Sequence, residues 1–174
     1  MSHIIVFCGE SGTGKTMLAQ LVSQELNIFC LHKDALKERL YELEGGKTLE
    51  DSTRTGKQSI FLMLDLAEDA IRNGVDIILE APFDHSENVI RFEQWMERYQ
   101  VSLKCIVCTV SEVVRQARIH DRPRHHAHHD QERLTPNYFQ LKYFSYHDMP
   151  GEQLVLNTDK PVAELMREVR SFVG

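Results

Sequence analysis

The sequence contains no apolar stretch of the length that crosses a membrane, and its first residues lack a basic segment followed by an apolar one. A membrane-spanning helix needs about 20 predominantly apolar residues, and a secretory signal peptide needs both of the segments that are missing. Internal repeats and low-complexity segments are also absent. We therefore expect a protein with no membrane span and no signal peptide, located in the cytoplasm.

Positive charge is also in short supply. The 20 lysines and arginines are outnumbered by 26 acidic residues, which gives a formal net charge of −6. General affinity for a nucleic-acid backbone depends on cationic side chains, so DNA or RNA is not an expected partner. The chain has 174 residues, 42% of them hydrophobic, which is enough for one domain with a substantial core.

Cysteine is limited to four residues, Cys8, Cys30, Cys105 and Cys108, and all of them fall in apolar runs typical of strands. Cys105 and Cys108 have C-x-x-C spacing, but residues three apart in a strand point to opposite faces. A second pair at the spacing of a zinc site is lacking. We expect buried thiols in a reducing compartment, with redox or metal use of the pair as the alternative.

The sequence does contain a complete phosphate-binding motif, G-x-x-x-x-G-K-[ST], which reads GESGTGKT over residues 9–16. An apolar run over residues 3–8 precedes it, and apolar residues at helical spacing follow it. Strand, glycine loop and helix form the arrangement in which backbone N–H groups surround a phosphate chain. We expect Lys15 to reach the β- and γ-phosphates of a nucleoside triphosphate and the Thr16 hydroxyl to ligate Mg²⁺. The nucleotide-binding residues predicted for this loop are Gly9, Glu10, Ser11, Gly12, Thr13, Gly14, Lys15 and Thr16.

Strands and helices alternate along the rest of the chain. Apolar runs predict strands at residues 3–8, 28–31, 76–80, 102–109 and 153–156. Helical spacing and end signals predict a loop at 45–55 and helices at 14–26, 33–44, 56–73, 86–99, 112–121, 136–147 and 160–173. Strands that are apolar throughout favour a parallel sheet with helices on both faces. This is a three-layer α/β/α fold, which binds ligands at the carboxyl ends of its strands.

Two acidic residues follow predicted strands. Asp34 comes after the strand at 28–31, where it can accept a hydroxyl proton and orient an attacking oxygen. The alternative is that Asp34 only stabilises the first turn of the next helix. Glu80 ends the strand at 76–80, where a carboxylate can act on Mg²⁺ through a water molecule. The alternative for Glu80 is a solvated acid at a strand end.

Arginines and histidines gather between residues 115 and 129. Arg118 and Arg122 are four residues apart, so a helix places them on one face, where they can stabilise a transferring phosphoryl group. The alternative is a solvated basic helix end. Residues 122–133 are poor in apolar residues and predict a mobile polar lid, which we favour over a metal site for the histidines His120, His125, His126, His128 and His129. Aromatic residues in the following helix predict packing, namely Tyr138, Phe139, Tyr143, Phe144 and Tyr146.

With these residues the chain resembles small P-loop kinases of the nucleoside-monophosphate-kinase-like superfamily. Within it, the chain is most similar to the predicted-kinase group that includes chloramphenicol phosphotransferase and zeta-toxin-type kinases. The resemblance rests on GESGTGKT, on the D-x-x-[RK] pattern of Asp34 and Lys37, and on the R-x-x-x-R pattern of Arg118 and Arg122. It implies one kinase domain over 1–174, a five-stranded sheet in the order 2-3-1-4-5, and a lid at about 118–135.

The resemblance also implies roles for single residues. It makes Asp34 the acceptor-side base, and Lys15, Arg118 and Arg122 the other catalytic residues. Thr158, in the turn after the last strand, would lie near the adenine of ATP, with Mg²⁺ as the metal.

Our leading hypothesis is an ATP-dependent kinase that transfers the γ-phosphoryl group to a hydroxyl of a small-molecule acceptor. One alternative is a nucleotide-dependent switch or ATPase, although the GTPase motifs D-x-x-G and N-K-x-D are absent from their expected places. Another alternative is a nucleic-acid-end kinase, with a basic rim formed by Arg39, Lys47, Arg54 and Lys57. Arg54 and Lys57 also suggest an anionic group on the acceptor.

Overall fold

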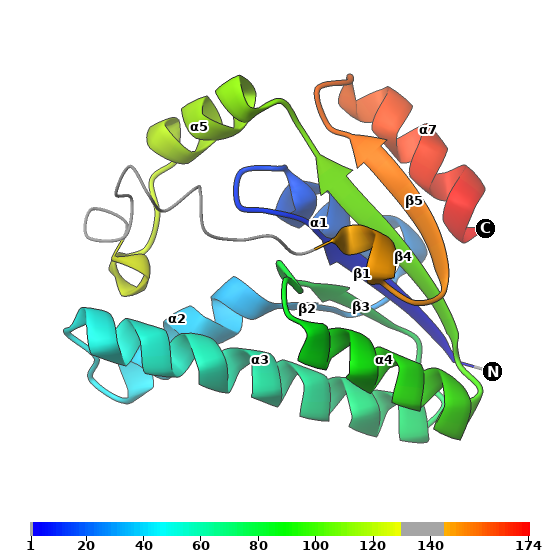
Figure 1. The fold of residues 1–174 in the computed structure, drawn as a ribbon, viewed down its shortest axis with the longest axis horizontal. Helices are drawn as coiled ribbons and strands as arrows, with labels where there is room; N and C mark the ends of the chain where they lie inside the picture. Colours follow the sequence, from blue (N-terminus) through cyan, green and yellow to red (C-terminus); the bar gives the residue numbers. More distant parts are fainter. Residues whose placement is uncertain (1, 130–144) are drawn as a thin grey trace.

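The computed structural model describes residues 2–129 and 145–174, and Figure 1 shows an open sheet between two layers of helices. In chain order the elements are β1 (His3–Cys8), α1 (Lys15–Leu26), β2 (Cys30–His32), α2 (Lys33–Leu43), α3 (Leu49–Arg72), β3 (Ile77–Glu80), α4 (Ser86–Tyr99), β4 (Ser102–Thr109), α5 (Glu112–Asp121), the 3₁₀ helices η1 (His126–His128) and η2 (Tyr146–Asp148), β5 (Glu152–Asn157) and α7 (Val162–Val173). Apart from α3 and the 136–147 segment, predicted and observed bounds agree within two residues.

The five strands are parallel and lie in the order β2-β3-β1-β4-β5, which confirms the predicted α/β fold and strand order. This order places β1 and the loop that follows it at the centre of the sheet. The carboxyl ends of the strands therefore surround the phosphate-binding motif at one edge.

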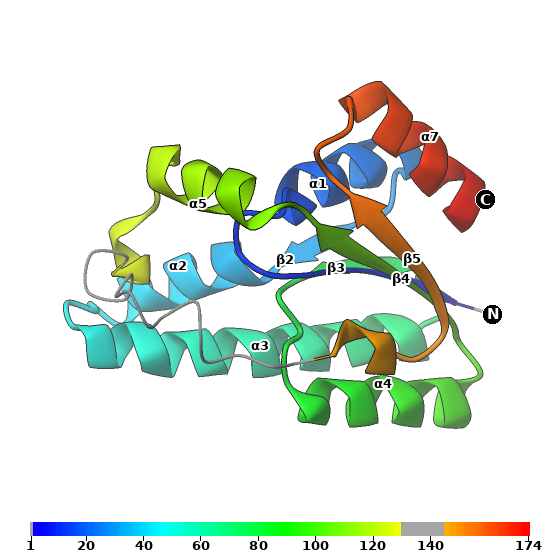
Figure 2. The same cartoon turned by 45° about the horizontal axis from the view of Figure 1, so that its top comes forward.

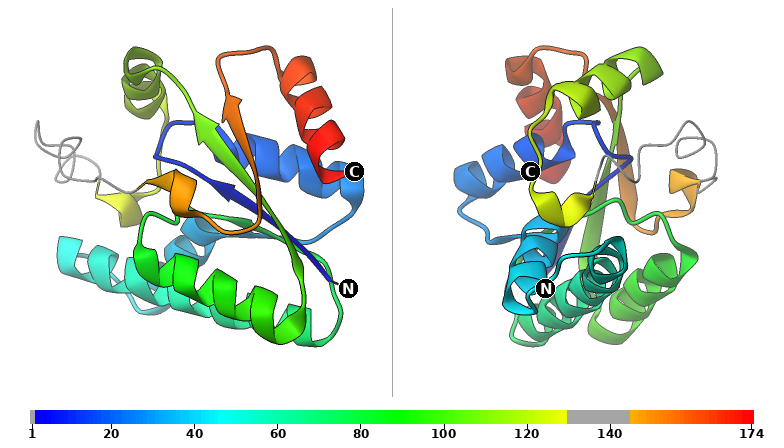
Figure 3. Two further views of the ribbon diagram at one scale, coloured as in Figure 1. Left: turned by 45° about the vertical axis from the view of Figure 1, so that its right-hand side comes forward. Right: turned by 90° about the vertical axis from the view of Figure 1, so that its left-hand side faces the viewer.

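Alternating side chains of β1 enter two separate core layers. Ile4 and Val6 pack with residues of α3 and α4 such as Met63 and Trp95. Phe7 and its neighbours on the other face pack with residues of α1 and α7, among them Leu18. Figures 2 and 3 show α1 and α7 on one face of the sheet and α3 and α4 on the other. Burial on both faces explains why the strands are apolar without alternation.

The cysteines follow the strand geometry that their spacing predicts. Cys105 belongs to the core layer under α3 and α4, and Cys108 to the opposite layer, which confirms that the pair points to two faces. Cys8, Cys105 and Cys108 are buried, whereas Cys30 is half-buried.

Helix α3 begins earlier than predicted, because residues 49–55 are helical rather than part of a loop. A capping box starts the helix: the Thr48 side chain accepts from the Asp51 backbone, and the Asp51 carboxylate accepts from the Thr48 backbone. The buried face of this first part consists of Ser52 and Thr55 instead of apolar residues. The apolar period that reveals a helix is therefore missing there.

Most of the predicted helix at 136–147 lies outside the described residues, and so do Tyr138, Phe139, Tyr143 and Phe144. At its end, Tyr146 belongs to the 3₁₀ helix η2 rather than to an α-helix. None of the helices described in residues 2–129 and 145–174 is both long and apolar enough to cross a membrane.

Candidate active site

The phosphate-binding loop joins β1 to α1 and lies against β4 and α5. Gly9 has a φ of 131°, and a Cβ at this position would lie 2.4 Å from the carbonyl oxygen of Cys108. Gly12 has a φ of 85°, and its Cβ would lie 2.9 Å from the carbonyl oxygen of Arg115. Neither the backbone conformation nor the space accepts a side chain, so both positions require glycine.

Lys15 opens α1 and is buried at the base of this loop. Its Nζ donates to the carbonyl oxygen of Glu10 at 3.1 Å and lies 3.9 Å from Oε1 of Glu80. Thr16 follows in the same helical turn and is half-buried. Lys15 and Thr16 are thus the first two residues of α1, as the motif predicts.

Glu80 ends β3 and is only 4% exposed, so the alternative of a solvated strand-end acid is wrong. Its Oε2 lies 3.1 Å from Nδ1 of His32, the last residue of β2. The parallel register pairs these two residues across β2 and β3. His32 has no signal of its own in the sequence, because only the strand register brings it to the carboxylate.

Asp34 lies in the first turn of α2 and contacts two cations. Its Oδ1 accepts from Nζ of Lys33 at 3.1 Å, and its Oδ2 lies 3.4 Å from Nη2 of Arg124. Burial alone would raise the pKa of the carboxyl, but the nearby positive charges outweigh it and hold the pKa well below its usual range. Asp34 is therefore an ionised carboxylate whose position depends on a residue 90 positions later in the chain.

The histidine segment, residues 125–129, packs along α2 and the start of α3. The 3₁₀ helix η1 gives this part of the predicted polar loop a regular structure. Four hydrogen bonds join the segment to these helices: His125 Nε2 to Glu42 Oε1 at 3.0 Å, Ser52 Oγ to the Ala127 carbonyl at 2.6 Å, His128 Nε2 to Glu38 Oε1 at 2.8 Å, and Tyr41 Oη to His129 Nε2 at 2.8 Å. Hydrogen bonds, together with ring contacts of Tyr41 with His126 and His129, thus dock a segment that is mostly polar, and sequence periodicity does not reveal these contacts.

His128 connects the histidine segment to Asp34. It is buried, and its Nδ1 lies 2.8 Å from Nη2 of Arg124, the guanidinium nitrogen that also faces Asp34. Within the part of the chain that the structure describes, no three His, Cys, Asp or Glu residues are placed to hold a metal ion.

Arg118, the predicted lid arginine, contacts Thr158, the residue predicted to lie near the adenine. Arg118 donates to the Thr158 hydroxyl and carbonyl oxygens at 3.0 Å each. The Thr158 hydroxyl donates to the carbonyl oxygen of Thr13 in the phosphate loop at 2.7 Å. Arg118 therefore contacts the loop side of the site through Thr158.

The prediction that Arg118 and Arg122 share a helical face is wrong. Helix α5 ends at Asp121, and Arg122 has an extended backbone and an exposed side chain. Arg115, one turn before Arg118, instead contacts the phosphate loop. Its Nη1 lies 3.4 Å from the Ser11 carbonyl oxygen while its other nitrogens bind Glu112.

In the structure, acidic side chains pair with part of the predicted basic rim. Arg54 forms ion pairs at 2.9 Å with Glu44 and with Asp51, so its charge is offset at the surface of α3. Lys57 is exposed on the same helix. This pairing weakens the suggestion that Arg54 recognises an anionic acceptor.

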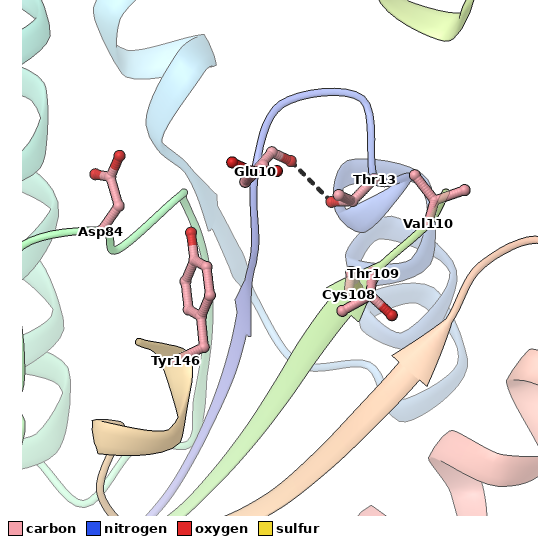
Figure 4. Close-up of a pocket in the computed structure, with 7 residues that line it drawn as sticks. All are labelled: Glu10, Thr13, Asp84, Cys108, Thr109, Val110 and Tyr146. Atoms are coloured by element: carbon pink, nitrogen blue, oxygen red, sulfur yellow. Dashed lines mark hydrogen bonds between the residues drawn. The ribbon is translucent and has the colours of Figure 1, made fainter. Parts of the chain in front are cut away.

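A cavity of about 260 Å³ lies beside the phosphate loop, and Figure 4 shows the side chains around it. The segment after β3 and the 3₁₀ helix η2 contribute to one side, and the loop and the end of β4 contribute to the other. The lining residues are Glu10, Thr13, Asp84, Cys108, Thr109, Val110 and Tyr146. Sequence reasoning did not single out Asp84 or Val110 for a site.

The model of a protein family described as an AAA domain matches residues 4–137 of the chain. No match was found among curated proteins. Among solved structures, the chain is similar to a proposed kinase from Chloroflexus aurantiacus J-10-fl, with 23% identity, a TM-score of 0.79, and coverage of 98% of this chain and 94% of that one.

Two further solved structures extend this likeness. A sugar kinase from Janibacter sp. HTCC2649 is 18% identical with a TM-score of 0.63, covering 99% of this chain and 94% of that one. The APS kinase CysC of Mycobacterium tuberculosis, solved with AMPPNP and APS, is 16% identical with a TM-score of 0.60, covering 99% and 97%. At these identities the likeness establishes the fold, which is that of small P-loop kinases.

Proposed function

The chain belongs to this AAA-domain family, and from its fold and site we propose that it is an ATP-dependent kinase acting on a hydroxyl of a small molecule. The observation that carries the proposal is the grouping of Lys15, Glu80 and Asp34 at the carboxyl edge of one sheet. A nucleotide switch needs the phosphate loop but does not need a carboxylate that orients an acceptor hydroxyl, which is the role we propose for Asp34.

The donor half of the site would be the glycine loop with Lys15. In-line phosphoryl transfer depends mainly on positioning and on charge stabilisation, and a buried lysine at the start of a helix provides both. Arg118 and Thr158 would bind the base side of ATP, supported by their contact with the loop at Thr13. We assign Arg122 to the closing side of the site on the resemblance alone.

The residues around Glu80 fit Mg²⁺. The Thr16 hydroxyl and the buried Glu80 carboxylate are hard oxygen donors, the ligand type that Mg²⁺ prefers, with Glu80 acting through water. His32 orients Glu80 through the bond to Oε2. Bound Mg²⁺ supplies positive charge that offsets the charge of the phosphates.

Asp34 would orient the acceptor. A carboxylate with a lowered pKa stays ionised and accepts a hydrogen bond from the attacking hydroxyl, which holds the oxygen in line. Arg124 and Lys33 would keep the carboxylate in that position. Arg124 also brings positive charge to the place where phosphoryl charge spreads during transfer.

We also propose that the chain is a single kinase domain and that residues 118–135 form its lid. The described part of that segment contacts the turn after β5 through Arg118 and α2 through His128, which supports a closing role. The free thiols support a reducing compartment such as the cytoplasm.

The test is Asp34→Asn, with Asp69→Asn as the matched control because Asp69 is an exposed acid on α3, outside the candidate site. We expect Asp34→Asn to lower the rate of acceptor phosphorylation by about 10²–10⁴-fold, since it removes the orienting carboxylate. ATP affinity should change little. Acceptors come from a screen of nucleosides, sugars, antibiotics and small alcohols that measures acceptor-dependent ADP release.

Two results would count against the proposal. An Asp34→Asn enzyme that phosphorylates at the wild-type rate would remove the role of Asp34. ATP hydrolysis that no acceptor stimulates would favour the alternative of a nucleotide-dependent switch or ATPase.

A further inference from the structure

Two side chains approach the buried carboxylate of Glu80 from different elements, His32 from β2 and Lys15 from α1. We propose that His32 is a positioning residue that holds Glu80 apart from Lys15, so that the lysine ammonium stays available for the phosphates of the nucleotide. This inference rests on the nucleotide binding of the proposed function, and it adds a residue that lies outside the phosphate-binding motif.

The place of Glu80 in the sheet makes His32 its hydrogen-bond donor. Glu80 lies between two parallel neighbours, paired with Phe7 on β1 and with His32 on β2. The Phe7 ring has no hydrogen-bonding group, whereas Nδ1 of His32 lies 3.1 Å from Oε2 of Glu80. An ionised carboxylate only accepts hydrogen bonds, so Nδ1 carries the hydrogen and donates it to Oε2.

The two oxygens of the Glu80 carboxylate differ in their contacts. Oε2 accepts from His32, whereas Oε1 lies 3.9 Å from Nζ of Lys15, a distance too long for a hydrogen bond. Nζ instead donates to the carbonyl oxygen of Glu10 in the phosphate loop at 3.1 Å. Within residues 2–129 and 145–174, the carboxylate of Glu80 has no hydrogen bond other than that from His32.

Burial gives this single hydrogen bond a large effect. The side chains of Lys15 and Glu80 are only 9% and 5% exposed. A buried carboxylate that loses its hydrogen bond is costly, and the nearest cation, Lys15, can replace the lost donor. Closing from 3.9 Å to the roughly 2.8 Å of a charge-assisted hydrogen bond needs only a small movement. A lysine paired in this way offers less of its charge to the phosphates.

The thiol of Cys30 does not take the hydrogen of His32 away from Glu80. Its Sγ lies 4.0 Å from Nδ1 of His32, farther than the carboxylate oxygen. Burial first, and then the negative charge of Glu80, raise the pKa of the thiol to about 12. The thiol therefore stays uncharged and is a weak acceptor, so the hydrogen on Nδ1 is directed to the carboxylate.

The experiment measures the affinity of a fluorescent ATP analogue for His32 variants, first in EDTA and then in Mg²⁺. EDTA separates the effect on Lys15 from any effect on the metal. We expect His32→Ala to bind at least about tenfold more weakly than the wild type in EDTA, which corresponds to one charged hydrogen bond. His3→Ala is the matched control, because His3 is the exposed first residue of β1 and should bind normally.

Two amide replacements test where the donor has to be. The side-chain nitrogen of asparagine takes the place of Nδ1, whereas that of glutamine takes the place of Nε2. We therefore expect His32→Asn to bind within about threefold of the wild type and His32→Gln to bind as weakly as His32→Ala. If His32→Ala proves unfolded in a thermal scan, the comparison of these two amides still tests the position of the donor.

A double variant separates positioning from a merely structural role of His32. Glu80→Gln removes the negative charge that would capture Lys15. In EDTA, His32→Ala should therefore change the affinity of Glu80→Gln by less than about threefold, although it weakens the wild type at least about tenfold. Damage to β2 or to the start of α2 would lower the affinity equally in both backgrounds.

The outcomes separate this inference from the proposed function. Wild-type affinity of His32→Ala, equal affinities of His32→Asn and His32→Gln, or a loss that persists in the Glu80→Gln background would overturn the inference and leave the kinase function standing. The expected pattern of affinities without phosphorylation of any acceptor would support the inference and overturn the kinase function. A wild-type protein that binds no nucleotide would overturn both.

Discussion

Replacement of His128 by alanine tests the link between the histidine segment and Asp34. His128 Nε2 lies 2.8 Å from Oε1 of Glu38, and Nδ1 lies 2.8 Å from Nη2 of Arg124. A guanidinium only donates hydrogen bonds, so Nδ1 accepts and Nε2 carries the hydrogen. The arrangement therefore requires a neutral imidazole, and protonation would place an N–H against Arg124.

The magnitude follows from these two bonds. A hydrogen bond to a charged partner contributes about 1.5–3 kcal/mol to stability. The Glu38 side chain is 34% exposed, so water replaces part of what the variant loses. We expect His128→Ala to lower the free energy of unfolding by about 2 kcal/mol at pH 8, which lowers Tm by about 4–8 °C for a chain of this size.

The effect should depend on pH in a defined direction. Burial lowers the pKa of His128, and the charges of Arg124 and Lys37 act in the same direction, against Asp34 and Glu38. A pKa below the unfolded value of about 6.5 means that the unfolded chain binds the proton more readily. The contribution of His128 is therefore complete above about pH 6.5 and is lost as the pH falls through the folded pKa.

The assay is thermal unfolding of wild type and His128→Ala at pH 8, 6.5 and 5. The difference in Tm should be largest at pH 8 and should shrink toward pH 5. His120→Ala is the control, because His120 is exposed at the end of α5 and should show neither the loss nor the trend. A difference that stays constant with pH, or the same trend in His120→Ala, would refute the assignment of a neutral His128 as the link.

Two further variants test the loop and the core. Gly12→Ala should weaken ATP binding by at least about tenfold in a fluorescent-nucleotide titration, because its Cβ would lie 2.9 Å from the Arg115 carbonyl oxygen at a positive φ. Gly45→Ala has a positive φ with open space around it and should bind normally; equal affinity in both variants would contradict the close packing. Met63→Ala should cost about 2–5 kcal/mol in urea unfolding because Met63 is fully buried between α3 and the sheet, whereas a loss no larger than that of the exposed Leu43→Ala would speak against it.

The sheet could be predicted because its strands contain runs of apolar residues. Strand β1 has five consecutive apolar residues after His3, β4 contains the apolar run Cys105–Cys108, and helices such as α4 have a clear amphipathic period. The first two turns of α3 escaped prediction because Ser52 and Thr55 form its buried face. Small polar residues satisfy their own hydrogen bonds within the helix, as Thr55 does with the Asp51 carbonyl at 2.8 Å. Such a face carries no apolar period.

The site was only partly visible for a related reason. The phosphate loop is a local motif, and its residues lie where the pattern predicts. The contact between Asp34 and Arg124 spans 90 positions, and the contact between Arg118 and Thr158 spans 40. Neither pair has a spacing that sequence could reveal. The polar histidine segment has the composition of a loop, and its hydrogen bonds to α2 and α3 have no signature in the sequence.

Helix α5 and the segment after it connect the two halves of the candidate site. Arg115 contacts the phosphate loop, Arg118 contacts the turn after β5, and Arg124 reaches Asp34 on α2. Arg115 and Arg118 belong to α5 itself, whereas the position of Arg124 depends on the docked histidine segment. Loosening that segment would release Arg124 from Asp34 while Arg115 and Arg118 keep their partners. Positioning of the acceptor should therefore fail before nucleotide binding does, because the two functions depend on different contacts along one continuous stretch of chain.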